Sequence, residues 1–185
     1  MNLYEILIIA FVLLINISFL GMMLGMMLHA SFGVPFIPSG RRTVKRMVEI
    51  AEIKPGDRVF DFGCGDGRLV FLSGEKGAKA TGIEFSPAVF LLAKIRGLFQ
   101  GSSNTKIRYG NFFSPRFSAD IESADVVFAF LLPRLMDKIF REIFPKMKPG
   151  SRIISHAFTP KGITPTRVIP RDKKHGKIFV FEKKD

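Results

Sequence analysis

Two acidic residues and three closely spaced glycines are the residues of this chain whose types and spacing best predict chemistry. The segment VFDFGCGDGRLV, residues 59–70, contains an apolar run that ends in Asp61, followed by glycines at positions 63, 65 and 67. This order predicts a strand, a tight turn and a helix, because glycine adopts backbone angles closed to other residues and lets a ligand approach the main chain. The first N–H groups of the helix would be free to bind that ligand.

The carboxylate before the turn favours a cationic ligand over a phosphate. Nicotinamide and flavin sites use the pattern GxGxxG at the same place, but here the third glycine comes one residue too early. A pyrophosphate favours an uncharged turn, whereas Asp61 attracts an amino group or a sulfonium. The segment resembles motif I of the Rossmann-like S-adenosylmethionine (AdoMet) methyltransferases. The resemblance implies AdoMet as cofactor, with contacts from the residues of the turn: Gly63, Cys64, Gly65 and Gly67.

A second acidic residue, Glu84, ends another apolar segment about 20 residues downstream, in AKATGIEFSP. A carboxylate at the tip of a second strand can accept hydrogen bonds from both hydroxyls of a ribose. Ser86 and Pro87 are typical of a helix N-cap and first helical residue, so Glu84 stands at a strand-to-helix junction. An exposed Glu before a helix is common, but its place one βα unit after Asp61 predicts a cofactor contact. Phe85 beside it could pack on the adenine.

The third segment is KIRYGNFF, which contains Gly110 and Asn111. In related methyltransferases an Asp usually follows this strand and contacts the adenine amino group. The resemblance implies that Asn111 takes this role through its amide oxygen, and that Phe112 or Phe113 supplies an apolar wall. The alternative interpretation of an Asn after a Gly is a plain turn.

The elements that must position these residues alternate between strands and helices. The patterns predict a helix at 43–53, a strand at 124–130, a helix at 133–144, a strand at 152–158 and a hairpin from 167–170 and 177–182. With the strands that end near Asp61, Glu84 and Gly110, they describe an α/β fold. We expect a Rossmann-like, seven-stranded methyltransferase sheet with one antiparallel strand near an edge, preceded by one transmembrane helix.

The N-terminal part has the composition of a membrane-spanning helix. Residues 6–28 carry no charge, and at about 1.5 Å per residue they can cross a hydrocarbon core of about 30 Å. A cleaved signal peptide typically has a shorter apolar part with basic residues before it. Here Glu5 precedes the run, and four basic residues follow it: Arg41, Arg42, Lys45 and Arg46. The positive-inside rule then predicts a single-pass anchor in the cytoplasmic membrane, with the catalytic domain facing the cytoplasm.

Three parts are therefore expected: an anchor at 1–30, a pre-methyltransferase segment and helix at 31–56, and an AdoMet-dependent methyltransferase domain at 57–185. Gly21 and Gly25 form a GxxxG pattern, which favours self-association or contact with a partner helix, although small residues are frequent in membrane helices.

The chain of 185 residues carries a formal net charge of +12, from 28 Lys and Arg against 16 Asp and Glu. We interpret this excess as contact with anionic lipid headgroups and expect no nucleic-acid partner, because no basic run is interleaved with aromatic residues. No metal site is expected, since Cys64 is the single cysteine and the three histidines are scattered.

Four segments, PFIPS, DFGCGDGRLV, ADVVFAFLLP and GSRIISHAF, narrow the resemblance. Together they resemble the small membrane-anchored lysine methyltransferases whose eukaryotic members modify the adenine nucleotide translocase and the ATP synthase c-subunit. The resemblance covers residues 34–182 and implies AdoMet-dependent methylation of lysine side chains on a protein in or near a membrane. It also implies that one group of residues folds over the cofactor: Phe36, Pro38 and Ser39. A second group would line the substrate side: Phe130, Leu131, Leu132 and Pro133.

No catalytic base is evident from the sequence. Asp125 begins a strand, and ligands bind at the carboxyl ends of strands, so it should lie at the wrong end of the sheet. His156, at the far end of the fifth strand, is better placed, but a structural histidine is the favoured interpretation. Two alternative functions remain: methylation of a lipid or quinone head, and an AdoMet-binding, non-catalytic membrane assembly factor.

Overall fold

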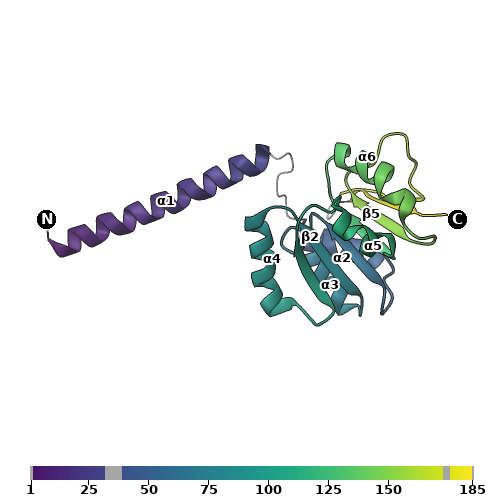
Figure 1. Ribbon diagram of the computed structural model, residues 1–185, viewed down its shortest axis with the longest axis horizontal. Coiled ribbons are helices and arrows are strands. Elements are labelled where there is room, and N and C mark those ends of the chain that lie inside the picture. Colours follow the sequence, from purple (N-terminus) through teal and green to yellow (C-terminus); the bar gives the residue numbers. More distant parts are fainter. Residues whose placement is uncertain (1, 32–38, 173–175, 185) are drawn as a thin grey trace. The chain divides into compact units, whose positions relative to one another are not determined.

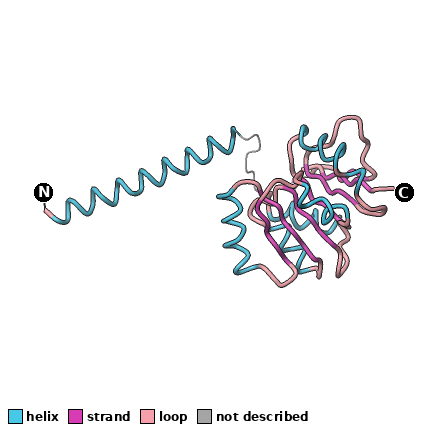
Figure 2. The backbone as a smooth tube through the Cα atoms, viewed as in Figure 1, coloured by secondary structure: helices cyan, strands magenta, loops and turns pink. Residues whose placement is uncertain are grey.

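The computed structural model describes residues 2–31, 39–172 and 176–184, with the backbone alone for residues 24–31. The chain divides into two compact units, residues 1–35 and 36–185. Figures 1 and 2 show the first as one long helix and the second as an α/β domain. The predicted contacts of Phe36 and Pro38 lie outside the described residues.

The first unit consists of helix α1 (Leu3–Ser31), whose side chains from position 3 to 23 are all exposed. The helix begins with a reciprocal cap. Asn2 Oδ1 accepts a hydrogen bond from the Glu5 N–H at 2.9 Å, and Glu5 Oε2 accepts one from the Asn2 N–H at 3.0 Å. The sequence therefore specifies where this helix starts, independently of any partner.

Residues Leu3–Met23 are long and apolar enough to cross a membrane, by length and composition alone. Asn16 donates its side-chain N–H to the Val12 carbonyl at 2.8 Å, so its amide is bonded within the helix. The self-association predicted for Gly21 and Gly25 stays a prediction.

The second unit is built on one seven-stranded sheet of order β3-β2-β1-β4-β5-β7-β6. The strands are β1 (Arg58–Phe62), β2 (Lys79–Glu84), β3 (Thr105–Tyr109), β4 (Val126–Ala129), β5 (Arg152–His156), β6 (Arg167–Ile169) and β7 (Ile178–Glu182). The strands β1 to β5 are parallel, and β7 lies antiparallel between β5 and β6. This arrangement confirms the predicted Rossmann-like sheet with one antiparallel strand near an edge.

Helices and short 3-10 turns connect the strands. They are α2 (Arg41–Ile50), α3 (Arg68–Glu75), α4 (Pro87–Gln100), η1 (Pro115–Phe117), α5 (Ser118–Glu122), α6 (Pro133–Glu142) and η2 (Phe144–Lys146). Because β-strand crossovers are right-handed and the strand order reverses after β3, α3 and α4 cover one face and α5 and α6 the other. Helix α2 packs on α3, and α4 lies against the edge strand β3.

Several predicted elements are shorter than expected: α6 ends at Glu142 rather than at residue 144, and β4 spans residues 126–129 rather than 124–130. For α2 and β5 the structure shows a local reason. Helix α2 ends at Ile50 rather than at residue 53, because Glu52 has a left-handed φ of 49°. Strand β5 ends at His156 rather than at residue 158. There Ala157 has a φ of 65°, and Ser155 Oγ donates a hydrogen bond to the Phe158 carbonyl at 2.6 Å. The shorter β5 leaves His156 at the edge of the sheet where the strands end.

Candidate active site

The predicted acidic residues lie at neighbouring strand ends where the strand order reverses. Asp61 is the fourth residue of β1, and Glu84 is the last residue of β2, which pairs with β1 in parallel register. On its other side β1 pairs with β4, so the point of reversal lies between β1 and β4. Crevices at such points, outside the carboxyl ends of the strands, are the usual ligand sites of doubly wound sheets.

The glycine turn after β1 needs glycine for two separate reasons. Gly63, Gly65 and Gly67 have φ values of 68°, 57° and 80°, a region that side chains disfavour. At Gly67, a Cβ would also lie 2.8 Å from the Phe71 ring, so the helix after the turn could not pack as it does. The turn therefore presents bare backbone at the start of α3, as the sequence pattern predicts.

Glu84 is held in place by the turn that it faces. Its Oε2 accepts a hydrogen bond from the Gly65 N–H at 3.0 Å, and its Oε1 accepts one from the Ser86 N–H at 2.8 Å. The carboxylate is buried, yet each oxygen keeps a second acceptor position. This geometry fixes the orientation of Glu84 and is compatible with the predicted contact to two ribose hydroxyls.

Asp61 is the least compensated acid of the site. It is 4% exposed, and among the described residues no basic side chain forms an ion pair with it. Burial, followed by the negative charges of Glu84 and Asp66, raises the pKa of Asp61 from 3.8 to about 8. Such a carboxyl group is suited to a cationic ligand, because a positive charge beside it would restore the ionised form.

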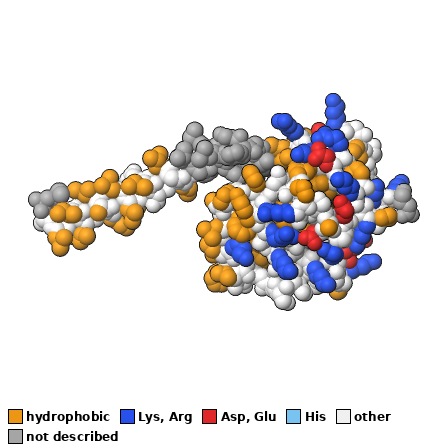
Figure 3. Space-filling model, in the orientation of Figure 1, with side chains coloured by type: hydrophobic (Ala, Val, Ile, Leu, Met, Phe, Trp, Pro, Cys, Tyr) orange, Lys and Arg blue, Asp and Glu red, His pale blue; other side chains and the backbone are white. Residues whose placement is uncertain are grey.

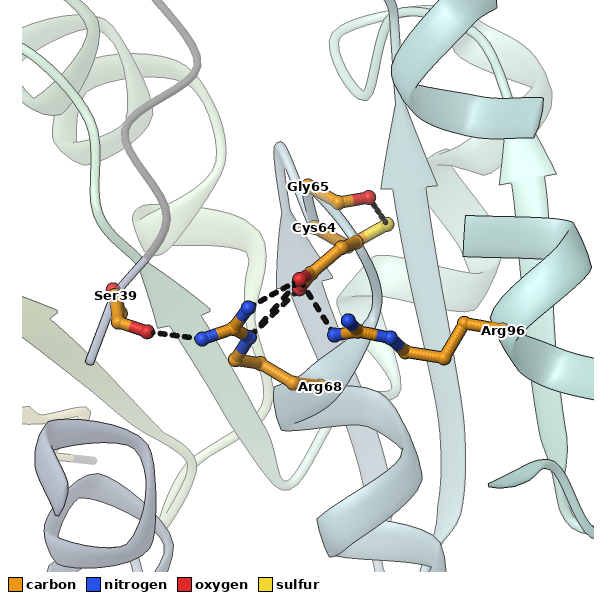
Figure 4. A network of polar contacts seen from close by, with 6 residues as sticks. Ser39, Cys64, Gly65, Arg68 and Arg96 are labelled. Atoms are coloured by element: carbon orange, nitrogen blue, oxygen red, sulfur yellow. Dashed lines mark hydrogen bonds and ion pairs between the residues drawn. The ribbon is translucent and has the colours of Figure 1, made fainter. Parts of the chain in front are cut away.

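A third carboxylate, Asp66, is neutralised by two arginines from different helices, which the sequence analysis missed. Arg68 of α3 binds both Asp66 oxygens, with Nε–Oδ1 at 2.9 Å, and Arg96 of α4 binds Oδ2 at 2.5 Å. Figure 4 shows the two guanidinium groups on either side of one carboxylate. Burial alone would raise the pKa of Asp66, but the hydrogen bonds and charges of the arginines hold it below its ordinary value.

The same network reaches the segment that precedes α2. Arg68 Nη1 donates a hydrogen bond to the Ser39 carbonyl at 2.6 Å, as Figure 4 shows. Ser39, predicted to fold over the cofactor, therefore lies beside the glycine turn. Asp66 and Arg68, two residues apart, were the sequence signal for part of this network, whereas nothing local marked Arg96.

The residues predicted to surround the adenine differ in their contacts and exposure. Asn111 Oδ1 accepts a hydrogen bond from the Phe113 N–H at 3.0 Å, so the amide forms the plain turn that was the alternative interpretation. Phe112 stacks on Phe62 of β1 with ring centroids 4.5 Å apart, which places an apolar wall beside the strand end. Phe85 is about half exposed, next to Glu84. Their adenine contacts stay predictions.

Cys64 has a packing role at the base of the turn. A Cβ at Gly82 of β2 would lie 2.6 Å from Cys64 Sγ, so the thiol occupies the space that this glycine leaves open. Burial raises the pKa of the thiol well above its ordinary value, which keeps it neutral and unreactive. The backbone N–H of Cys64 donates a hydrogen bond to the Ile83 carbonyl at 3.2 Å, and the cofactor contact of Cys64 stays a prediction.

The residues predicted for the substrate side divide between core and surface. Leu131 is buried, and its Cδ2 would lie 3.2 Å from a Cβ at Gly63, so it supports the turn from below. Phe130 is partly exposed and packs on two residues that follow or end β5, with centroids 4.5 Å from His156 and 6.2 Å from Phe158.

The two residues after Leu131 reach the surface: Leu132 and Pro133. Asp125 lies at the other end of the sheet, as predicted, where it binds Lys148 and the Arg58 N–H. In the described part of the chain, no three His, Cys, Asp or Glu side chains gather into a possible metal site.

Comparison with known proteins agrees with this geometry. Residues 61–167 match the family model described as the ANTKMT methyltransferase domain. A protein-lysine N-methyltransferase of Saccharolobus islandicus (strain REY15A) is 34% identical over 139 residues, which cover 74% of this chain and 84% of that protein. The Rattus norvegicus lysine N-methyltransferase of the ATP synthase c-subunit is 26% identical over 125 residues, which cover 68% of this chain and 56% of that enzyme. The chain thus spans only about half of the mammalian relative.

A solved structure is similar over almost its whole length. It is the RNA methyltransferase of Salinibacter ruber in complex with S-adenosyl-L-homocysteine, with a TM-score of 0.72 and 27% identity. The similarity covers 80% of this chain and 95% of that one.

The raised pKa of Asp61 makes a prediction about stability. In the unfolded chain this carboxyl ionises near pH 3.8, and in the folded protein near pH 8, so between these values the folded state binds more protons. Stability must therefore fall as the pH rises from about 4 to 8. Asp61→Asn, which cannot ionise, should raise the free energy of unfolding at pH 8 by about 2 to 4 kcal/mol and flatten this pH dependence.

The measurement is urea unfolding of the cofactor-free protein in detergent at pH 5 and pH 8. Glu49→Gln, on the exposed side of α2, is the matched control and should change stability by less than about 0.5 kcal/mol. Equal stability of wild type and Asp61→Asn at both pH values would show that Asp61 is ionised when the site is empty of ligand.

Proposed function

The chain belongs to the family of the ANTKMT methyltransferase domain, and from this membership we propose that it is a membrane-anchored, AdoMet-dependent enzyme that methylates lysine side chains of a membrane-associated protein. The observation that carries the proposal is the buried pair Asp61 and Glu84 around the glycine turn, in a chain similar to protein-lysine methyltransferases.

The residues of the site fit AdoMet. Asp61 offers a buried carboxyl group for its amino group, and each Glu84 oxygen, bound to one backbone N–H, keeps an acceptor position for a ribose hydroxyl. The glycines of the turn carry no side chain that would keep a ligand from the main chain, and Phe85 and Phe112 supply flat apolar surfaces for the adenine. Bound AdoMet supplies a methyl group activated by the sulfonium, so the protein needs no metal or redox group for the transfer.

What the chain itself contributes is position and exclusion of water. Phe130, directly after β4, packs on His156, the last residue of β5, and on Phe158, and the three rings form an aromatic wall beside the strand ends. Such a wall removes water from an incoming lysine, which lowers the pKa of its ammonium and favours the neutral, nucleophilic amine. The His156 ring packs against the Phe130 ring, which supports a structural role for His156 in this wall.

The membrane location rests on α1 and on charge. Leu3–Met23 has the length and composition of a membrane span, and the four basic residues at 41, 42, 45 and 46 follow it. They favour a catalytic domain on the cytoplasmic side. Every buried side chain that the structure describes lies between Thr43 and Phe181, within the second unit.

Cofactor binding is tested by Glu84→Ala. The change removes the acceptor predicted for the ribose hydroxyls and should weaken AdoMet binding by about 1.5 to 3 kcal/mol, roughly tenfold to a hundredfold. Isothermal titration calorimetry measures the affinity, and Glu75→Ala, on the exposed end of α3, is the control with no expected change. Unchanged affinity in both Glu84→Ala and Asp61→Ala would overturn the assignment of the pocket.

The acceptor class is tested with methyl-labelled AdoMet and membranes of the cell that makes the protein. We expect label in protein, recovered as methyl-lysine after hydrolysis, and none with Glu84→Ala. Label confined to the lipid extract would favour the lipid or quinone alternative, and label in RNA would favour the activity named for the Salinibacter ruber structure.

A chain without residues 1–30 should still bind AdoMet but methylate its membrane substrate much more slowly, since anchoring raises the local substrate concentration.

Orientation is a separate prediction. Protease added outside intact cells should leave the domain from residue 40 onward uncut, and should cut it after the membrane is permeabilised. If the protease cut the folded domain in intact cells, the domain would face outward, opposite to the prediction. The assignment of the active site would not be affected.

A further inference from the structure

Helix α4 turns its largest apolar side chains away from the protein. Leu98 is 81% exposed and Phe99 84% exposed, and three further residues of this helix are also exposed: Leu91, Leu92 and Ile95. Because successive residues of an α-helix are about 100° apart, these five form one continuous stripe. We call them the α4 apolar face. An amphipathic helix on a globular protein ordinarily directs such a stripe into the core.

Contacts on the inner side of α4 keep the helix from rotating about its own axis. Ala93 is fully buried, and Gly97 faces Phe71 of α3, where an added Cβ would lie 3.4 Å from the ring. Only small residues fit at this contact. Arg96 also binds Asp66 beside the glycine turn. The packing and the ion pair together fix which side of α4 faces outward.

The α4 apolar face is bordered by positive charge on both sides. Lys94 lies at one edge of the stripe and Arg96 at the other, by their positions on the helix. Figure 3 shows hydrophobic side chains gathered over the part of the domain where Figure 1 places α4, with basic side chains beside them. An apolar stripe with cationic borders is the pattern of helices that lie in the membrane interface.

We infer that α4 docks the catalytic domain on a lipid bilayer, with the α4 apolar face inserted at the level of the headgroups. The inference deepens the proposed membrane location and rests on it. In this position Lys94 extends toward anionic phosphates while its stem contacts the acyl chains, and Arg96 stays bound to Asp66.

A bilayer fits this face better than a second copy of the chain does. A two-fold contact through one helix face would bring Lys94 near its own copy, in a protein that already carries +12. Anionic headgroups instead complement the charge of Lys94. The membrane is also within reach, because Ser31 and Ser39 are separated by at most about 29 Å of extended chain.

The docking would orient the active site. Helix α4 begins at Pro87, directly after Glu84 and Ser86, and Arg96 connects it to Asp66 of the glycine turn. A helix that lies in the plane of the interface keeps the neighbouring strands close to that plane. The strand ends then open along the membrane surface, where a lysine just outside the bilayer of a membrane protein is accessible.

Tryptophan fluorescence tests the inference in the full chain, because the protein has no tryptophan of its own. Leu98→Trp and Phe99→Trp place the probe on the α4 apolar face at highly exposed positions, so folding should not be affected. Glu142→Trp, at the exposed end of α6, is the matched control. Each variant is reconstituted into vesicles of phosphatidylcholine and phosphatidylglycerol, with phosphatidylcholine brominated at defined acyl carbons as quencher.

We expect blue-shifted emission from Leu98→Trp and Phe99→Trp, with stronger quenching by bromines near the headgroups than at the chain ends, consistent with a depth of about 5–10 Å. Glu142→Trp should emit as in water. Adding Lys94→Gln to Leu98→Trp should reduce quenching in anionic vesicles. Water-like emission from both α4 probes would overturn the inference. Blue-shifted emission without lipid quenching, increasing with the ratio of protein to lipid, would also overturn it and assign the face to a second copy.

The labelling experiment with AdoMet is independent of these spectra. Lipid quenching of the α4 probes without methyl-lysine formation would leave the docking in place and remove the proposed acceptor. Methyl-lysine formation by a chain whose α4 probes remain in water would support the proposed acceptor and overturn the docking of α4.

Discussion

The burial of three carboxylates around one turn is the constraint on which the rest of the catalytic domain depends. They differ in how far their charge is compensated. Glu84 accepts backbone N–H groups of Gly65 and Ser86, and Asp66 binds two arginines. Among the described residues Asp61 has neither kind of partner, so its burial costs stability as long as no cation lies beside it. The fold thus keeps one unfavourable group at the proposed cofactor site, and such perturbed groups cluster at functional sites.

The parts of the site that follow from strand geometry could be predicted from the sequence. Asp61 and Glu84 each end an apolar run, and consecutive parallel strands bring such ends together. The glycines at 63, 65 and 67 predicted the turn, because a left-handed backbone restricts the choice of residue in any fold. The antiparallel β7 was also predicted, since its hairpin pattern came after the last βα unit.

The parts that depend on packing could not be predicted. Arg96 lies 30 residues from Asp66, and no local pattern marks their contact. The sequence of α4 is apolar around most of its circumference, so its periodicity does not say which side is buried. The small residues Ala93 and Gly97 decide this, through contact with α3. Asn111 shows the opposite case, because its hydrogen bond to Phe113 is local and the alternative of a plain turn was available from the start.

The ion-pair network gives the site two mechanical connections beyond the sheet. Through Arg96 the glycine turn is joined to α4, and through Arg68 it is joined to Ser39, the residue that directly follows the segment leading from α1. Both connections converge on Asp66, whose pKa the two arginines hold low, so the network stays charged across the physiological pH range. A displacement of either α4 or Ser39 would therefore change the position of the same glycine turn. If α4 docks on a bilayer as inferred above, that contact would act on the position of the glycine turn through one carboxylate.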